Sequence, residues 1–245
     1  MKKSVFAFCV LMLAGLVQAA DVDQATDERI RSSLGALLPG LRPDGVRATP
    51  IDNLFEVTFG TRVVYVTGDG RFLVQGKVID LETRTEITEQ RLSELKMAAL
   101  AEVGEDRMVI YGPADAKHTV TVFTDIDCGF CRKLHADMPE YNKQDIRIRY
   151  LFYPRAGLGS ESYDKAVSVW CADDRKAAMD TAKAGDAVPA KTCENPVAEH
   201  HALGQAMQLQ GTPALLLEGG QMVPGYVPPD KLRTLLDQQR AQSNG

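Results

Sequence analysis

A run of apolar and β-branched residues, 118–124, ends shortly before two cysteines that are three positions apart, Cys128 and Cys131. Such a continuous run is typical of a strand that is buried on both faces of a sheet. The apolar residues that follow fall at helical spacing until Pro139, and residues 146–153 predict a second strand. This order predicts an α/β unit in which the cysteine pair stands at the start of the helix.

The rest of this unit combines helical segments with short strands. In chain order they are helices 160–171, 173–184 and 196–209, strands 214–217 and 221–223, and a helix 229–239 that a proline begins. We expect the first three helices to form an insertion in the α/β unit.

The preceding block of the chain has a different pattern. One amphipathic helix is followed by short runs of period two between Gly, Asp and Asn turn signals, which predict the helix at 27–38 and strands at 46–49, 54–58, 63–67 and 72–81. This is a small, mainly antiparallel α+β unit of about sixty residues, near the lower size limit for standing alone. Pairing with a second copy would stabilise it.

A helix at 88–103 separates the two blocks, with Thr88 as its expected N-cap and Gly104 closing it. We interpret it as a linker rather than as part of a core. The predicted domains are a signal peptide 1–20, an N-terminal domain 21–84, a linker helix 85–104 and a second domain 105–245.

The first twenty residues have the three parts of a secretory signal. Lys2 and Lys3 precede the apolar run 4–17, and small residues offer cleavage near Ala19 or Ala20. The alternative is a membrane anchor, but the run is shorter than the ~20 residues that a spanning helix needs. We therefore expect the mature chain to be exported and soluble.

The charge balance is acidic. Loss of the two signal lysines reduces 28 basic side chains to 26 against 33 acidic ones, so the formal net charge changes from −5 to −7. Binding to nucleic acid has no electrostatic basis here.

Cys128 and Cys131 are too close in sequence for a disulfide between them to restrict the unfolded chain much, so chemistry is the better explanation of the pair. A thiolate at a helix N-terminus is stabilised by outward N–H groups and by the helix dipole, which predicts a Cys128 pKa below the free value of ~8.5. Cys131, one turn further along, can resolve a mixed disulfide formed by Cys128. Asp127 opposes thiolate formation and Arg132 favours it, and the sequence does not decide between them.

The other two cysteines of the mature chain, Cys171 and Cys193, are 22 positions apart. In an oxidising compartment we expect them to form a structural disulfide worth roughly 3 kcal/mol in the chain-entropy model. Redox participation is the minority alternative. A zinc site completed by Cys128 and Cys131 is another, but only the close pair has metal-ligand spacing.

Three motifs in this order resemble the periplasmic disulfide isomerases of the DsbC/DsbG family, within the thioredoxin superfamily. They are Phe123-Thr124-Asp125-Ile126-Asp127-Cys128-Gly129-Phe130-Cys131, then Gly211-Thr212-Pro213-Ala214, then Val223-Pro224-Gly225-Tyr226. The similarity extends over nearly the whole mature chain, including the Gly68-Asp69-Gly70 turn.

The resemblance implies a cystatin-like α+β dimerisation domain, a linker helix and a thioredoxin-like α/β domain with an inserted helical segment, assembled as a V-shaped periplasmic homodimer. It implies that Cys128 is the nucleophile and Cys131 the resolving thiol, and that Gly129, Phe130, Thr212 and a cis Pro213 face the substrate. The implied substrates are misfolded, disulfide-bonded exported proteins, with chaperone activity and electrons from a DsbD-like membrane reductant. No metal and no cofactor other than the Cys128–Cys131 disulfide is implied.

Two departures from the family pattern are small. Gly129-Phe130 stands where Gly-Tyr is common, and Arg132 where histidine is often found. Gly129-Phe130 and the Cys171/Cys193 pair favour the DsbC type over the DsbG type. A net oxidase of the same fold, a DsbG-like reductase of sulfenylated cysteines, a non-enzymatic periplasmic chaperone and a zinc-binding module remain as alternatives.

Overall fold

The computed structural model describes residues 22–243, so the signal peptide expected at 1–20 lies outside the described residues. The chain divides into two compact units: 22–57 with 64–74, and 58–63 with 75–243. Among the described residues, no helix has the length and apolar character needed to cross a membrane.

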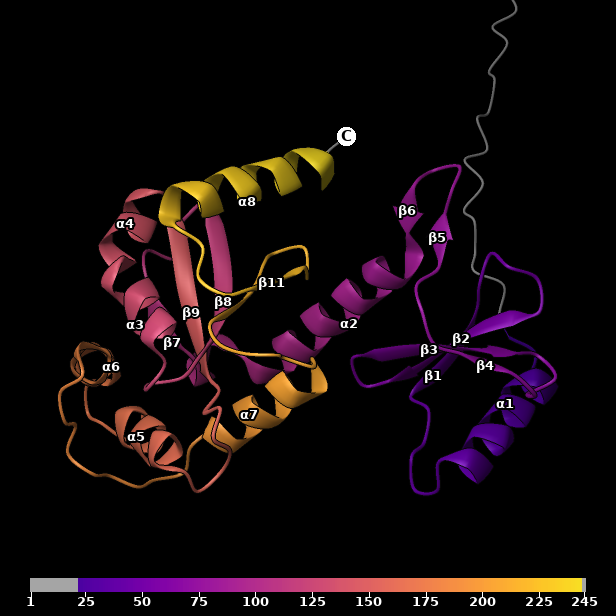
Figure 1. Ribbon diagram of the computed structural model, residues 1–245, viewed down its shortest axis with the longest axis horizontal. Coiled ribbons are helices and arrows are strands. Elements are labelled where there is room, and N and C mark those ends of the chain that lie inside the picture. The colour runs from indigo at the N-terminus through magenta and orange to yellow at the C-terminus, as the bar shows by residue number, and fades with distance from the viewer. Residues whose placement is uncertain (1–21, 244–245) are drawn as a thin grey trace, which may run out of the picture. The chain divides into compact units, whose positions relative to one another are not determined.

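The first unit packs one helix on a four-stranded sheet (Figure 1). Helix α1 (Gln24–Leu37) is capped by Asp23, whose carboxylate accepts a hydrogen bond from the Thr26 N–H at 3.0 Å, and it buries Ile30 and Leu34. The strands lie in the order β1 (Gly45–Ala48), β2 (Leu54–Phe59), β3 (Arg62–Thr67) and β4 (Leu73–Val74).

The expected strand at 72–81 is wrong, because this stretch forms two separate short strands. β4 pairs with β3, whereas β5 (Ile79–Asp80) pairs with β6 (Thr85–Glu86) in a hairpin of its own. Gly76 stands between the two strands. A glycine weakens a strand interior because it adds backbone entropy and no packing surface.

Helix α2 (Ile87–Val103) begins one residue before the expected cap, and Thr88 does not cap it. The Thr88 hydroxyl instead accepts a hydrogen bond from the Val78 N–H at 2.8 Å and so holds the β5–β6 hairpin to the helix. We expected this helix to connect rather than to pack, but Leu100 in its C-terminal half lies in a core cluster of the second unit.

The second unit is built on a five-stranded sheet in the order β11-β10-β8-β9-β7. The strands are β7 (Val109–Tyr111), β8 (His118–Thr124), β9 (Ile146–Phe152), β10 (Ala214–Leu216) and β11 (Met222–Pro224). β8 and β9 are parallel, and the other pairs are antiparallel. Strand β7 was not expected from the sequence.

Helices cover both faces of this sheet, so β8 is buried on each side (Figure 1). Val120 and Val122 contribute to the larger core cluster, and Phe123 to the smaller one, which includes Leu100. The helices are α3 (Gly129–Ala136), α4 (Met138–Lys143), α5 (Glu161–Trp170), α6 (Arg175–Ala184), α7 (Val197–Ala206) and α8 (Pro229–Ser243), and a 3₁₀ turn, η1, covers Glu105–Arg107.

Pro139 does not end the helix that follows the cysteine pair, as the spacing predicted. The helix breaks at Asp137, and Pro139 lies in the first turn of α4. Proline is tolerated in a first turn because the N–H groups there have no partner within the helix.

Candidate active site

Cys128 lies at the junction of β8 and α3, where it is the N-cap residue of the helix. Both it and Cys131 in the first turn are free thiols, with exposed fractions of only 3% and 0%. The turn before them is shaped by Asp125, whose carboxylate accepts the Asp127 N–H at 2.8 Å. The fold therefore places the Cys128 sulfur at the positive end of a helix dipole, where negative charge is favoured.

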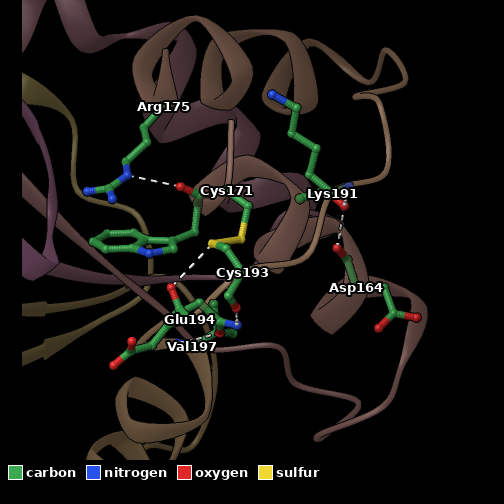
Figure 2. Close-up of a disulfide and its surroundings, with 10 residues drawn as sticks. Asp164, Cys171, Arg175, Lys191, Cys193, Glu194 and Val197 are labelled. Atoms are coloured by element: carbon green, nitrogen blue, oxygen red, sulfur yellow. Dashed lines mark hydrogen bonds between the residues drawn. A yellow bond between two sulfur atoms is a disulfide. The ribbon is translucent and has the colours of Figure 1, made fainter. Parts of the chain in front are cut away.

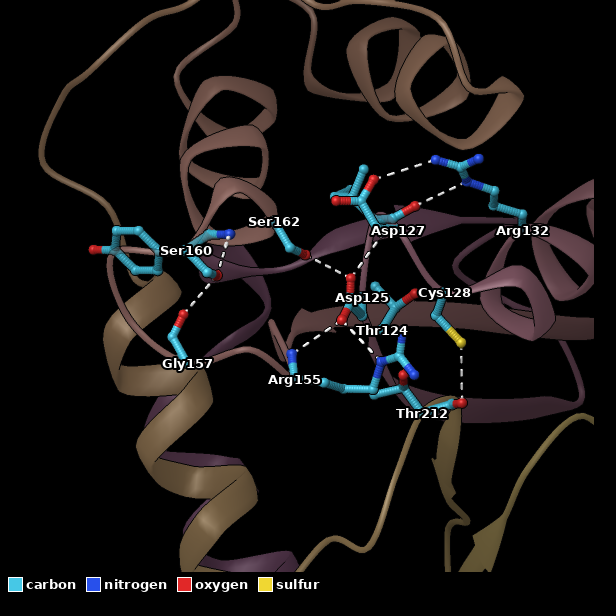
Figure 3. Close-up of polar contacts among 12 residues, drawn as sticks. Thr124, Asp125, Asp127, Cys128, Arg132, Arg155, Gly157, Ser160, Ser162 and Thr212 are labelled. Carbon is cyan, nitrogen blue, oxygen red and sulfur yellow. Dashed lines mark hydrogen bonds and ion pairs between the residues drawn. The ribbon is translucent and has the colours of Figure 1, made fainter.

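The second sequence motif meets the first at this point. The Thr212–Pro213 peptide bond is cis, and Pro213 immediately precedes strand β10, which pairs with β8. The Cys128 thiol donates a hydrogen bond to the Thr212 carbonyl oxygen at 3.2 Å (Figure 3). Residues 84 positions apart in the chain thus form one site.

The pKa of Cys128 is lowered below the ordinary thiol value. Burial alone would raise it, but the Thr212 side chain, hydrogen bonds from Cys131 and the positive charge of Arg155 together outweigh burial. The bond to the Thr212 carbonyl favours the protonated form, since a thiolate cannot donate. The net direction gives Cys128 more thiolate at neutral pH than a free cysteine has.

The structure answers the question that Asp127 and Arg132 left open. The two side chains pair with each other at 3.3 Å, and Lys165 also binds Asp127 at 3.0 Å (Figure 3). Asp127 is thereby neutralised by two cations. Arg155, which the sequence did not single out, is a cation whose charge lowers the Cys128 pKa.

Asp125 is the organising carboxylate behind the site, although no role was expected for it from the sequence. It is 3% exposed and accepts hydrogen bonds from the Ser162 hydroxyl at 2.5 Å and from Arg155 Nε at 3.0 Å (Figure 3). Burial raises the pKa of this carboxyl, but the Ser162, Arg155 and Asp127 hydrogen bonds outweigh it and hold the pKa below its usual value. Asp125 therefore stays charged at neutral pH and fixes Arg155 beside Cys128.

The pKa of Cys131 is raised, in contrast to that of Cys128. Burial raises its pKa, while the charge of Lys183 and a hydrogen bond from the Thr124 side chain oppose that rise. Lys183 is a second functional candidate that the sequence did not reveal. It is buried on α6, within the inserted helical segment.

The two residues between the cysteines face solvent. Phe130 is 64% exposed, and no atom lies within 4 Å of where a Gly129 side chain would begin. An exposed aromatic ring next to a reactive thiol offers an apolar contact for another chain.

Cys171 and Cys193 form a disulfide with an S–S distance of 2.03 Å (Figure 2). Next to it, Arg175 stacks on the Trp170 ring, with its guanidinium carbon 3.5 Å from the ring centroid. Because both sulfurs are bound to each other, neither can complete a zinc site with Cys128 and Cys131. The part of the chain that the structure describes holds no group of three or more His, Cys, Asp or Glu side chains placed to bind a metal.

Two family models and several known proteins match the chain. A thioredoxin-like domain model matches residues 105–240, and a disulfide bond isomerase protein N-terminal domain model matches residues 18–89. Thiol:disulfide interchange protein DsbC of Dickeya dadantii is 40% identical over 98% of both chains, and that of Escherichia coli K12 is 35% identical over 91% of this chain and 92% of its own. A solved disulfide interchange protein from Neisseria gonorrhoeae is 32% identical, and its superposition covers 55% of this chain and 96% of that protein's chain, with a TM-score of 0.49.

Proposed function

This chain belongs to the DsbC family of thiol:disulfide interchange proteins and is a thiol:disulfide oxidoreductase of the disulfide-isomerase kind, and from that premise we propose that Cys128 and Cys131 are its redox pair. The observation that carries the proposal is the free Cys128 thiol at the α3 N-terminus, beside Thr212 and with a lowered pKa. We assign the attack on substrate to Cys128 and the resolving step to Cys131.

In this mechanism the Cys128 thiolate attacks one sulfur of a substrate disulfide and forms a mixed disulfide, while the other substrate sulfur leaves as a thiolate. That thiolate can attack elsewhere in the substrate and finally displace Cys128, which rearranges the disulfide without net oxidation or reduction. Alternatively Cys131 attacks Cys128, the reduced substrate leaves, and a Cys128–Cys131 disulfide remains. The second route consumes two electrons, so we infer a DsbD-like dithiol reductant that restores the pair.

The substrate class follows from the chemistry and from the exposed surface at the site. Phe130, between the two cysteines and 64% exposed, offers an apolar contact that an incompletely folded protein could use. We propose misfolded, disulfide-bonded exported proteins as substrates, with accompanying chaperone activity. Neither role needs a metal or an organic cofactor.

We further propose that the chain works as a homodimer in the periplasm. Strand β4 is an outer strand of the first unit's sheet, and Phe72, Leu73 and Val74 expose 56%, 36% and 47% of their surface. An apolar outer strand is normally covered by a partner, and a second copy would cover it. The basic and apolar segment at 1–20 supports export to an oxidising compartment.

The experiment is the recovery of activity by a scrambled, multiply disulfide-bonded protein, with the signal-free chain beside its Cys128→Ala variant. We expect the native chain to restore activity and Cys128→Ala to restore none. If neither restores activity while both suppress aggregation, the protein is a holdase and the redox proposal is wrong. If the native chain only reduces sulfenylated cysteines, the DsbG-like alternative holds.

A further inference from the structure

The third sequence motif, residues 223–226, has no part in the mechanism above. It begins in strand β11, whose Pro224 lies opposite Ala214 of β10, and the strand ends there. The next residue, Gly225, has a φ of 80°, a left-handed conformation that residues with a side chain rarely adopt. The chain therefore turns out of the sheet at this glycine, and Tyr226 follows the turn.

The turn at Gly225 holds the segment that contacts Cys128. The Gly225 N–H donates a hydrogen bond to the Pro213 carbonyl oxygen at 2.8 Å. The preceding carbonyl, that of Thr212, accepts the hydrogen bond from the Cys128 thiol at 3.2 Å. The motif is thus one hydrogen bond and one residue away from the contact between the two halves of the active site.

Tyr226 holds the other half, helix α3. Its hydroxyl donates a hydrogen bond at 2.5 Å to the carboxylate of Asp137, the C-cap residue of α3. On the same helix, Lys133 Nζ lies 4.7 Å from the centroid of the Tyr226 ring. Burial, followed by the bond to Asp137, raises the pKa of Tyr226 to about 12, so the hydroxyl keeps its proton at neutral pH and remains a donor.

A second tyrosine fixes the same segment from α4. The hydroxyl of Tyr141, which is buried, donates to the Val227 carbonyl oxygen at 2.5 Å. Three consecutive residues, 225–227, thus each form a hydrogen bond to a different part of the second unit. These bonds restrict how far the segment can move from α3 and α4.

Helix α3 is short enough to transmit this restriction to the cysteine pair. It has eight residues and therefore a length of about 12 Å. Cys128 caps one end of this helix and Asp137 the other. Because the helix is continuous between them, a hydrogen bond at Asp137 restricts where Cys128 can lie relative to Thr212.

We propose that Tyr226 is a positioning residue for the redox pair: by binding Asp137 it holds α3 against the 212–213 segment and so maintains the Cys128–Thr212 contact. This inference rests on the proposed function, in which Cys128 and Cys131 alternate between dithiol and disulfide. Tyr226 acts through Asp137 and does not touch the reacting sulfurs.

The Cys128–Thr212 hydrogen bond belongs to the dithiol form alone. When Cys128 enters a disulfide it loses its proton, so it can no longer donate to the Thr212 carbonyl oxygen. Any group that maintains this hydrogen bond therefore favours the dithiol over the disulfide. Loss of the Tyr226 hydroxyl should shift the redox equilibrium toward the disulfide.

The test is the redox equilibrium of the signal-free protein with glutathione as the probe. One molecule of oxidised glutathione and the dithiol give the Cys128–Cys131 disulfide and two molecules of reduced glutathione, so atoms and electrons balance. Samples are equilibrated without air at mildly acidic pH, where more of Cys128 carries the proton that the hydrogen bond to Thr212 needs. After an acid quench, peptic digestion and mass spectrometry give the fraction of the pair that is oxidised.

Three variants make the comparison sharp. Tyr226→Phe keeps the ring next to Lys133 and removes only the hydroxyl, whereas Asp137→Ala removes the acceptor. Tyr163→Phe is the matched control, because Tyr163 is also half-buried against the larger core cluster. Its hydroxyl has no hydrogen-bond partner within residues 22–243.

We expect Tyr226→Phe and Asp137→Ala each to raise the equilibrium constant for oxidation about threefold to tenfold, the range that the loss of one hydrogen bond allows. The double variant should show no larger effect than either single change, because both remove the same bond. Tyr163→Phe should keep the native constant. A bond that only stabilises the fold would stabilise both redox forms equally and would leave the constant unchanged.

A native or lower constant in Tyr226→Phe would overturn the inference and leave the proposed function intact. Effects of the two single changes that multiply in the double variant would overturn it as well, because the two side chains would then act independently. If Tyr226→Phe does not fold, a native constant in Asp137→Ala overturns it. Failure of the native chain to form a Cys128–Cys131 disulfide at any ratio of the two glutathione forms would instead refute the proposed function.

Discussion

The Cys128/Cys131 pair and the Cys171/Cys193 pair lie in the same unit but at opposite ends of helices. Cys128 is the N-cap of α3, whereas Cys171 is the C-cap of α5. Helix N-termini favour negative charge and helix C-termini disfavour it, so a thiolate is stabilised at the first cysteine and opposed at the second. Arg155 adds to the stabilisation at Cys128.

The difference teaches that reactivity comes from the position of a cysteine and not from its presence. The first pair spans a short turn and consists of two free, buried thiols. The second closes a loop of 22 positions and is described as a disulfide. A reactive thiol needs a stabilised thiolate, whereas a structural disulfide needs a long loop to close.

The largest expected effect comes from removing Cys128, the proposed nucleophile. Cys128→Ala should reduce disulfide exchange to the uncatalysed background, because no thiolate remains that can attack the substrate. The measurement is the rate of exchange with oxidised glutathione, followed by mass spectrometry. Exchange at the native rate in this variant would place the nucleophile elsewhere.

Removing the other pair should affect stability and not chemistry. The double variant Cys171→Ala/Cys193→Ala should lose about 3 kcal/mol of unfolding free energy, the chain-entropy value for a loop of this length. Urea unfolding measures the loss. Under conditions where the variant is folded, Cys128 should react at its native rate. A large loss of that rate would show that the Cys171–Cys193 disulfide also contributes to the reactivity of Cys128.

Asp125→Asn tests the hydrogen-bond network that supports the Cys128/Cys131 pair. The folded-state pKa of Asp125 is lowered, so its contribution to stability is present above the ordinary carboxyl pKa and is lost as the pH falls through the lowered value. At neutral pH the variant should be less stable by about 2 kcal/mol, since a buried charged hydrogen-bond network is broken. Urea unfolding should show a smaller difference in unfolding free energy between the variant and the native chain at strongly acidic pH than at neutral pH. An equal difference at both pH values would contradict the role assigned to Asp125.

The smallest expected effect concerns Arg155. Arg155→Met should raise the pKa of Cys128 only slightly, because the guanidinium is half exposed and its charge is screened by water. The pH dependence of Cys128 alkylation measures the shift. Arg132→Met serves as the matched control, since that cation pairs with Asp127 at 3.3 Å. An equal or larger shift in the control would show that Arg132 and not Arg155 tunes the thiol.

The sequence predicted the parts of the fold whose signals are local. Strand β8 follows from a continuous apolar run and helix α3 from apolar residues at helical spacing, whereas the pairing with Thr212 follows from the family resemblance. Strand β7 was missed because three residues carry too little pattern. Arg155 and Lys183 were missed because they meet Cys128 and Cys131 only after the chain has folded. Asp125 lies inside the recognised motif, and its place directly before the cysteine turn was a signal that could have found it.

The most direct test of the account is to trap the intermediate. In a Cys131→Ala variant the mixed disulfide cannot be resolved, so incubation with a disulfide-bonded substrate protein should accumulate a covalent complex. Peptide mapping should find the substrate sulfur on Cys128, as the account predicts. A complex joined through Cys171 or Cys193, or the absence of any complex while the native chain still exchanges disulfides, would contradict the assignment of Cys128 as the nucleophile.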